Sequence, residues 1–320
     1  MSVVVGVGVA VLSLVVASGC SDDSDSKSSS SSDGSVGPSS IVTSTDSTNL
    51  SSTPTSSLAV GTAPVDDLTG PVGIVALGHS GLTGENSVPE RAGQPALENS
   101  WATGTADGLG SIYQRMVELR PETAGHVANE ARGGTPAADL TAQARRALKE
   151  VPTPELVIIQ TIDHDIRCDG TDDAHVAEFG AALETMLTVV TEASPDTKIL
   201  MLTQPGRPAL ELESMAELIA STPAARASYT GPPPCGMLNE SGDQQPENIA
   251  TLTSIIESYE TEQARVCAEY LNCSTDSGRL ASFRRVPSMV SSDFNHLNTE
   301  GLARLAAAVW PIVENIISEH

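Results

Sequence analysis

Residues 72–77, VGIVAL, form an uncharged apolar run that ends at Gly78. A short apolar run bounded by glycine is typical of a buried strand. Two further runs follow whose interiors are apolar, ELVIIQ over 155–160 and KILML over 198–202. Strands that are apolar throughout occur where helices cover both faces of a parallel sheet. These three runs therefore favour an α/β fold.

The segments between the runs have helical patterns. The expected helices are Leu109–Leu119, Ala137–Leu148, Val176–Val190, Ile249–Leu271 and Thr299–Ile317, and two weaker strands are expected at His126–Ala128 and Phe283–Val286. Strands that alternate with helices indicate β-α-β units, whose right-handed crossovers place helices on both faces of the sheet. We predict a three-layer α/β/α sandwich of the flavodoxin-like kind with about five parallel strands. It forms one domain over residues 71–320, with a Pro- and Gly-rich excursion at 204–248.

The composition excludes several classes of function. The chain has 320 residues with 17 Lys and Arg against 41 Asp and Glu, a formal net charge of −24. Neutralising nucleic-acid phosphates requires clustered Lys and Arg, so we expect no nucleic-acid partner. An acidic surface is also repelled by anionic lipid headgroups, so attachment to a membrane must come from another feature.

That feature lies at the N-terminus. Residues 3–19 are uncharged and mostly apolar, have the length of a signal-peptide core and end in small residues before Cys20. Residues 17–20, ASGC, resemble the bacterial lipobox, in which the signal is cleaved before a cysteine that carries diacylglycerol. The resemblance implies a signal peptide over 1–19 and an extracytoplasmic lipoprotein of a bacterium, anchored to the cell membrane at Cys20. An uncleaved anchor and an ordinary cleaved signal peptide are the alternatives.

A tether is expected to follow the lipid-attachment residue. From Ser21 to Leu58, 22 of 38 residues are Ser or Thr. Such a stretch cannot bury enough apolar surface to offset the entropy of ordering it. We therefore expect residues 20–70 to be the lipid-attachment cysteine and a disordered, Ser/Thr-rich tether.

Four cysteines lie within the expected domain: Cys168, Cys235, Cys267 and Cys273. An even number in an exported chain favours two disulfides. Of the three possible pairings we favour a local link between Cys267 and Cys273, with a long-range link between Cys168 and Cys235. A thiolate metal site is the alternative, although the chain lacks the Cys-x-x-Cys spacing that supports such a site.

Polar side chains follow the expected strands, where open parallel sheets bind their ligands. The segments are Gly78-His79-Ser80-Gly81, the loop 129–139, Asp163-His164-Asp165 and, before the last helix, Asp293-Phe294-Asn295-His296. A serine hydroxyl needs an imidazole to take its proton, and the imidazole needs a carboxylate to fix its tautomer. Ser, His and Asp at these positions predict a hydrolytic triad.

In order and spacing the four segments resemble the motifs of the SGNH, or GDSL-type, hydrolase family. Its members have Gly-Asp-Ser after the first strand, a glycine-containing loop after the second, Gly-x-Asn-Asp after the third, and Asp-x-x-His before the last helix. The resemblance covers residues 72–317. It implies a serine ester hydrolase without metal or cofactor, in which Ser80 is the nucleophile, His296 the general base and then acid, and Asp293 the residue that orients His296.

The resemblance also implies an oxyanion hole. Its donors are the backbone N–H groups of Ser80 and Gly133, with Gly134 as the alternative to Gly133, and a side chain from the third segment. In the family that side chain is the Asn, and here His164 stands in its place. A neutral imidazole keeps one N–H, so we expect His164 to replace the amide.

Other positions depart from the family pattern or admit other interpretations. His79 stands for the Asp of the first motif and Ile162 for the Gly of the third. An α/β-hydrolase elbow, Gly-x-Ser-x-Gly, is disfavoured because Leu82 stands at its last glycine. A zinc site from His79, Asp163, His164 and Asp165 is a further alternative. We interpret Arg284 and Arg285 as solvated charges.

The sequence thus predicts an exported, lipid-anchored serine esterase that hydrolyses a small-molecule, glycan or lipid ester. The rival function is a binding lipoprotein of the cell envelope that keeps the fold and has lost catalysis through His79 and His164. The identity of the ester and the oligomeric state are not predicted.

Overall fold

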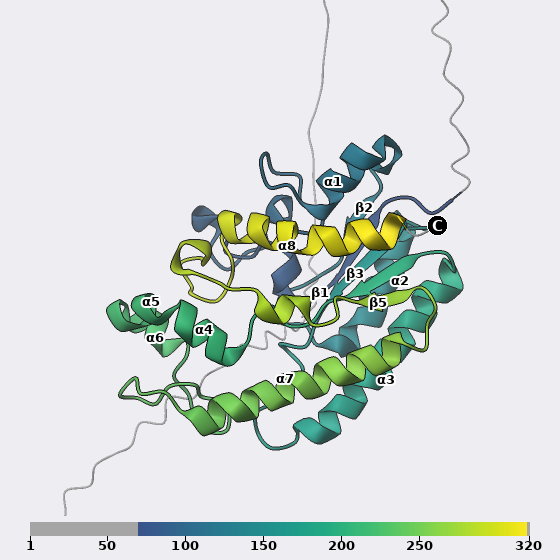
Figure 1. Cartoon of the computed structure of the whole chain (residues 1–320). Coiled ribbons are helices and arrows are strands. Elements are labelled where there is room, and N and C mark those ends of the chain that lie inside the picture. The colour runs from purple at the N-terminus through teal and green to yellow at the C-terminus, as the bar shows by residue number, and fades with distance from the viewer. Residues whose placement is uncertain (1–69, 319–320) are drawn as a thin grey trace, which may run out of the picture. The chain divides into compact units, whose positions relative to one another are not determined.

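A computed structural model of the protein describes residues 70–318 (Figure 1). The predicted signal peptide, Cys20 and the tether up to residue 69 lie outside the described residues. Five strands form one parallel sheet in the order β2-β1-β3-β4-β5. Their bounds are Ile74–Gly78 (β1), Val127–Asn129 (β2), Leu156–Gln160 (β3), Lys198–Met201 (β4) and Cys273–Thr275 (β5).

Helices cover both faces of the sheet (Figure 1). The longer ones are Ile112–Leu119 (α1), Leu140–Glu150 (α2), Asp172–Ala193 (α3), Pro246–Cys267 (α7) and Thr299–Ser318 (α8). Because successive strand residues point to opposite faces, Ile74 packs with α1 and α8 while Val75 packs with α2, α3 and α7. Both apolar clusters are buried, and the fold is the expected three-layer α/β/α sandwich. Within residues 70–318 no helix combines the length and apolar character needed to cross a membrane.

Local sequence signals explain where several helices begin. Ser111 caps α1, and its side chain and that of Gln114 satisfy each other's backbone N–H groups as a capping box. Helix α7 has Pro246 at its first position, where the missing N–H of proline costs no hydrogen bond. The excursion after β4 contains the short helices Pro208–Ser214 (α4), Ala216–Ser221 (α5) and Pro223–Ala227 (α6). Leu212 of α4 and Ile219 of α5 belong to a small apolar cluster that is separate from the two on the sheet.

The fifth strand differs from the prediction. It is Cys273–Thr275, and the predicted strand Phe283–Val286 is wrong, because that segment is a loop beside the cavity described below. The chain leaves α7 at Cys267 and returns at once to the edge of the sheet beside β4, where a three-residue strand suffices. An edge strand this short, half-buried and without an apolar run gives almost no sequence signal.

The two disulfides of the structure are the two pairs that the sequence analysis favours. Cys267 and Cys273 connect the end of α7 to β5, with Cα atoms 5.3 Å apart. Cys168 and Cys235 connect the loop after β3 to the excursion, with Cα atoms 5.8 Å apart. The second disulfide therefore fixes the excursion next to the carboxyl ends of the strands.

Candidate active site

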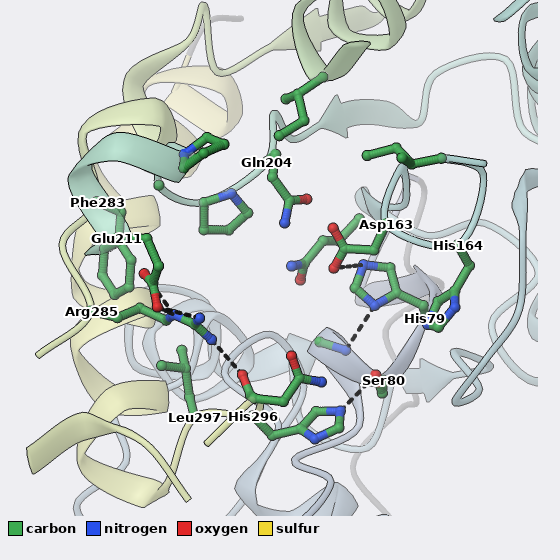
Figure 2. A pocket seen from close by; sticks show the side chains of 18 of the residues that line it. His79, Ser80, Asp163, His164, Gln204, Glu211, Phe283, Arg285, His296 and Leu297 are labelled. Carbon is green, nitrogen blue, oxygen red and sulfur yellow. Dashed lines mark hydrogen bonds and ion pairs between the residues drawn. The ribbon is translucent and has the colours of Figure 1, made fainter. Parts of the chain in front are cut away.

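A cavity of about 490 Å³ lies at the carboxyl ends of the strands (Figure 2). Its lining includes Ser80 from the segment after β1, His164 from the segment after β3, and His296 from the segment before α8. The excursion supplies much of the remaining wall. Three of the four motif segments thus meet at one opening, as the positions of parallel strand ends require.

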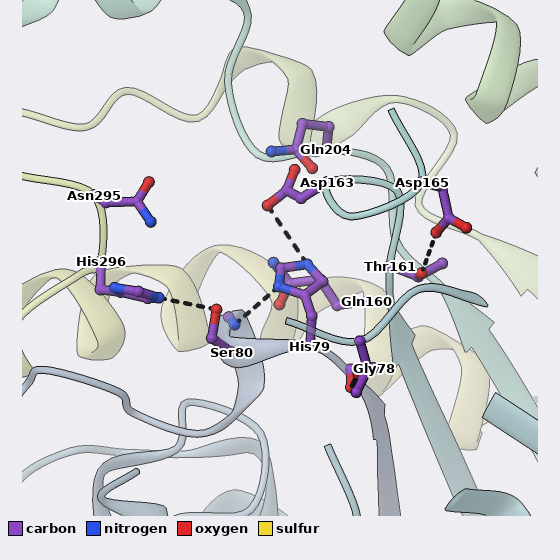
Figure 3. Close-up of polar contacts among 12 residues, drawn as sticks. Gly78, His79, Ser80, Gln160, Thr161, Asp163, Asp165, Gln204, Asn295 and His296 are labelled. Atoms are coloured by element: carbon purple, nitrogen blue, oxygen red, sulfur yellow. Dashed lines mark hydrogen bonds and ion pairs between the residues drawn. The ribbon is translucent and has the colours of Figure 1, made fainter. Parts of the chain in front are cut away.

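Ser80, His296 and Asp293 form a continuous chain of hydrogen bonds. The Oγ atom of Ser80 lies 2.9 Å from Nε2 of His296 (Figures 2 and 3). The Nδ1 atom of the same ring lies 2.6 Å from Oδ2 of Asp293. Both distances are those of good hydrogen bonds. This is the geometry in which an imidazole can accept the serine proton while a carboxylate stabilises the resulting charge.

The backbone after β1 places Ser80 at the mouth of the cavity. Ser80 begins a 3-10 turn directly after the strand. Gly78, the last strand residue, has φ 145°, and a Cβ atom there would lie 1.8 Å from the carbonyl oxygen of Gln160. Only glycine fits this close approach of two strands. The sharp turn that presents Ser80 therefore depends on Gly78.

Backbone hydrogen bonds hold Asp293 and His296 in place in the segment before α8. Oδ1 of Asp293 accepts the backbone N–H groups of Asn295 and His296, each at 3.0 Å. The carbonyl of His296 accepts the N–H of Ser291 at 2.8 Å. Asn298 accepts the N–H of Gly301 at 3.0 Å and so caps α8. These bonds fix the spacing of Asp293 and His296 before any ligand binds.

Asp293 and His296 each stabilise the charged form of the other. Burial alone would raise the pKa of Asp293, but hydrogen bonds from the His296 ring and from two backbone N–H groups outweigh burial and lower it to about 2. Burial alone would lower the pKa of His296, but the hydrogen bond and charge of Asp293, with the charge of Glu85, raise it above its ordinary value of 6.5. Asp293 is therefore ionised throughout the neutral range, and His296 is a stronger base than a free imidazole.

The raised pKa of His296 predicts a pH dependence. Protonated His296 cannot accept the Ser80 proton, so kcat/KM for a neutral ester should fall as the pH falls through a pKa above 6.5. The measurement is kcat/KM between about pH 5 and pH 9. An acid limb centred below 6.5 would contradict the assigned environment of His296.

Asn86 is a site residue that the sequence did not reveal. Its Nδ2 atom donates to Oδ2 of Asp293 at 2.5 Å and lies 3.3 Å from Nδ1 of His296. Its backbone has φ 60°, a left-handed conformation that asparagine tolerates better than most residues. It lies in the loop after Ser80 and matches no motif, so the backbone preference of asparagine is the only sequence signal, and a weak one.

Replacing Asn86 with glycine tests its positioning role. Glycine keeps the left-handed backbone without strain and removes both the donor to Asp293 and the Oδ1 acceptor of the Gly93 N–H. We expect kcat to fall about tenfold with little change in KM, as the loss of one hydrogen bond to a charged group predicts. The acid limb should move to higher pH, because a carboxylate with one donor fewer stabilises protonated His296 more strongly. An unchanged limb with a raised KM would indicate a merely structural role.

Gly133 rather than Gly134 adjoins Ser80. A Cβ atom on Gly133 would lie 3.9 Å from Cβ of Ser80 and 2.6 Å from a carboxylate oxygen of Glu85, whereas one on Gly134 would have no atom within 4 Å. Within residues 70–318 no acceptor pairs with the backbone N–H of Ser80 or of Gly133. Both N–H groups are thus available to a ligand beside Ser80.

His164 is not part of the hydrogen-bonded chain of Ser80, His296 and Asp293. It is an exposed residue of the cavity wall, and its ring packs edge-on against that of His79 with 5.5 Å between centroids. Figure 2 shows it beside His79, on the side away from His296. The structure therefore brings together Ser80, His296 and Gly133, and places His164 next to His79 instead.

Ile162 and Asp165, in the same loop after β3 as His164, are buried and contribute to the structure of that loop. Ile162 is fully buried at φ 93°, a strained conformation for a β-branched residue, at the position where the family pattern has glycine. Asp165 accepts the backbone N–H of Ala137 and the hydroxyl of Thr161, and burial raises its pKa. Across residues 70–318, no three His, Cys, Asp or Glu side chains gather as a metal ion would require.

An ion pair between Glu211 and Arg285 joins the excursion to the segment of His296. Nε of Arg285 lies 3.0 Å from both carboxylate oxygens of Glu211, which also accepts the hydroxyl of Tyr229 at 2.7 Å. Arg285 further donates to the carbonyl of Asn295. The expectation of a solvated charge is therefore wrong for Arg285, because an acidic partner from another segment covers it.

Removing one member of this pair is expected to destabilise the fold. Glu211→Leu or Arg285→Met leaves a partly buried charge without its partner, which typically costs about 3–5 kcal/mol. The double variant should cost clearly less than the sum of the two single variants. Urea unfolding of the four proteins measures this, and additive effects would contradict the coupling.

Comparison with solved structures gives several matches at low sequence identity. TesA is 15% identical with a TM-score of 0.45, and the match covers 76% of this chain and 98% of that chain. The extracellular lipase of Streptomyces rimosus is 14% identical with a TM-score of 0.42, covering 77% and 99%. Phospholipase A1 of Streptomyces albidoflavus is 11% identical with a TM-score of 0.42, also covering 77% and 99%. No protein-family model and no curated protein matches the chain.

Proposed function

We propose that the protein is a serine ester hydrolase of the SGNH type. The observation that carries the proposal is the hydrogen-bonded chain from Ser80 through His296 to Asp293 at the mouth of a cavity. Nothing in the fold requires Ser80 to meet the segment of Asp293 and His296, which lies 216 residues further along the chain at His296. A hydroxyl, a base and a carboxylate in line are the parts of nucleophilic acyl transfer.

The chemistry proceeds in two halves. Oγ of Ser80 attacks the ester carbonyl while Nε2 of His296 takes its proton, and the protonated ring then gives that proton to the departing alcohol. Water, activated by His296, attacks the resulting acyl-serine and releases the acid. The N–H groups of Ser80 and Gly133 would hold the oxyanion in both halves. Each such donor typically contributes about 100- to 1,000-fold in rate.

We further propose that the enzyme works outside the cytoplasm of a bacterium, anchored to the cell membrane through lipid on Cys20. The lipobox-like ASGC at 17–20 and the Ser/Thr-rich segment after it support this proposal. The two disulfides of the folded part agree with an oxidising compartment. Its ester would then be an acylated glycan or lipid of the cell envelope.

A binding lipoprotein without catalysis is the competing function. Two departures favour it, since His79 replaces the Asp of the first motif and His164, in place of the Asn, has its close contact with His79. The intact chain from Ser80 to Asp293 favours the enzyme.

A fluorophosphonate probe separates the two, because it labels only a serine that a base activates. We expect labelling on the peptide that contains Ser80, together with turnover of p-nitrophenyl acetate. An unlabelled Ser80 and no turnover would support the binding protein.

A further inference from the structure

Two atoms in the wall of the cavity are buried without a hydrogen-bond partner. Within residues 70–318 there are five such side-chain atoms, and two of them, Nε2 of His79 and Oε1 of Gln204, belong to residues that line the cavity. Buried polar atoms are normally paired, since leaving one unpaired costs free energy. Because both residues line the cavity that Ser80 also lines, these two atoms point to a ligand group.

The hydrogen bonds of His79 determine which of its nitrogens carries the proton. Its Nδ1 atom accepts the backbone N–H of Gly81 at 3.1 Å, so Nδ1 has no proton of its own (Figure 3). The ring is only 3% exposed, and burial lowers its pKa, which favours the neutral form. A neutral imidazole without a proton on Nδ1 carries it on Nε2. Nε2 is therefore a donor, and the nearest carboxylate oxygen, of Asp163, lies 3.6 Å away, too far for a good hydrogen bond.

Gln204 supplies an acceptor in the same region. It follows β4, and its backbone N–H donates to Glu260 at 2.9 Å, which fixes the start of its side chain. Figure 3 shows its amide next to the carboxylate of Asp163, with His79 on the other side of that carboxylate. One donor and two acceptors thus border one part of the cavity.

We propose that His79, Asp163 and Gln204 form a subsite for a hydroxyl group in the alcohol half of the ester, as in glycerol monoesters and sugar esters. A hydroxyl can accept from Nε2 of His79 and donate to Asp163 or Gln204 at the same time, whereas an alkyl group satisfies neither. The proposal rests on the proposed function and specifies its substrate class.

The opposite wall explains why the subsite is assigned to the alcohol half. Phe283 and Leu297 lie across the cavity from His79 and Asp163 in Figure 2, with the Glu211–Arg285 ion pair between them, and Leu302 and Leu305 extend the lining with apolar surface. An acyl chain gains by burying its methylene groups against such a wall. The acyl half therefore belongs on that side of Ser80, and the alcohol half faces the polar subsite.

The test compares propyl butyrate with glycerol 1-monobutyrate, which share the acyl chain and differ in the hydroxyls of the alcohol. We expect kcat/KM to be about tenfold higher for the monobutyrate, the effect of one well-placed hydrogen bond. His79→Asn keeps an acceptor for the Gly81 N–H and removes the Nε2 donor, and Gln204→Met removes the amide at similar size. Either change should reduce this preference toward unity.

A control variant removes a comparable atom elsewhere. Oγ1 of Thr123 is also buried and unpartnered but lies outside the cavity lining, so Thr123→Val should retain the preference. If His79→Asn fails to fold, Gln204→Met carries the test alone, and fluorophosphonate labelling shows that its Ser80 remains activated.

Equal turnover of the two esters, or an unchanged preference in both variants, would overturn the subsite. A preference only for propyl 3-hydroxybutyrate, whose hydroxyl lies in the acyl half, would overturn its assignment to the alcohol. Failure of every ester, together with an unlabelled Ser80, would instead overturn the proposed function and this proposal with it.

Discussion

Replacing Ser80 by alanine is expected to lower kcat for ester hydrolysis by about four to six orders of magnitude. Without Oγ no acyl-enzyme can form, and the remaining rate comes only from His296 acting on water next to the oxyanion donors. The side chain is small and its hydroxyl bonds to His296, so the fold should persist. Turnover of p-nitrophenyl butyrate measures the effect.

Ser258→Ala provides the matched control for this variant. Ser258 is an exposed serine on α7, away from the cavity lining, and its loss should leave the rate unchanged. If Ser80→Ala retained the rate of the parent protein, the nucleophile would lie elsewhere.

Replacing Asp293 by asparagine should have the next largest effect, about 10⁴-fold in kcat. Oδ2 of Asp293 accepts from Nδ1 of His296, which leaves Nε2 free to accept the serine proton. An amide nitrogen at that position would donate to Nδ1 and force the ring proton onto Nε2, where it blocks Ser80. The replacement is nearly isosteric, so the effect reports tautomer and charge rather than packing.

Comparing Asp293→Asn with Asn86→Gly separates the effect of the His296 tautomer from the effect of losing one hydrogen bond to Asp293. Both variants disturb the same carboxylate, but only Asp293→Asn reverses the tautomer, so its loss should exceed the other by roughly a thousandfold. Steady-state kinetics of both variants with one ester provide the measurement. Equal losses would mean that Asp293 only holds the loop in place.

Most of the fold could be predicted because its strands are long apolar runs. The runs at β1 and β3 are buried throughout and the run at β4 is buried after Lys198, so their sequences carry a strong signal. The fifth strand could not be predicted, since Cys273–Thr275 is short and half-buried and its pairing depends on where α7 ends. In both cases the extent to which a strand is buried determines how clearly its sequence pattern predicts it.

Only those site residues that lie in recurring sequence motifs could be predicted from the sequence. Ser80 and His296 lie in such motifs, and the structure places them 2.9 Å apart. Asn86 and Arg285 act through partners that are distant in the chain, and no local pattern reports such contacts. The charge of Arg285 was misinterpreted for the same reason, because Glu211 lies in the excursion and its approach depends on the tertiary fold.

The most direct test of the central claim is to trap the acyl-enzyme. The purified protein is mixed with p-nitrophenyl acetate, quenched in acid within the first turnover and examined by intact-protein and peptide mass spectrometry. The proposed mechanism predicts the added mass of one acetyl group, located on Ser80 and absent from Ser80→Ala. Turnover of the ester without any acetyl adduct, or with the adduct on another residue, would contradict a Ser80 acyl-enzyme.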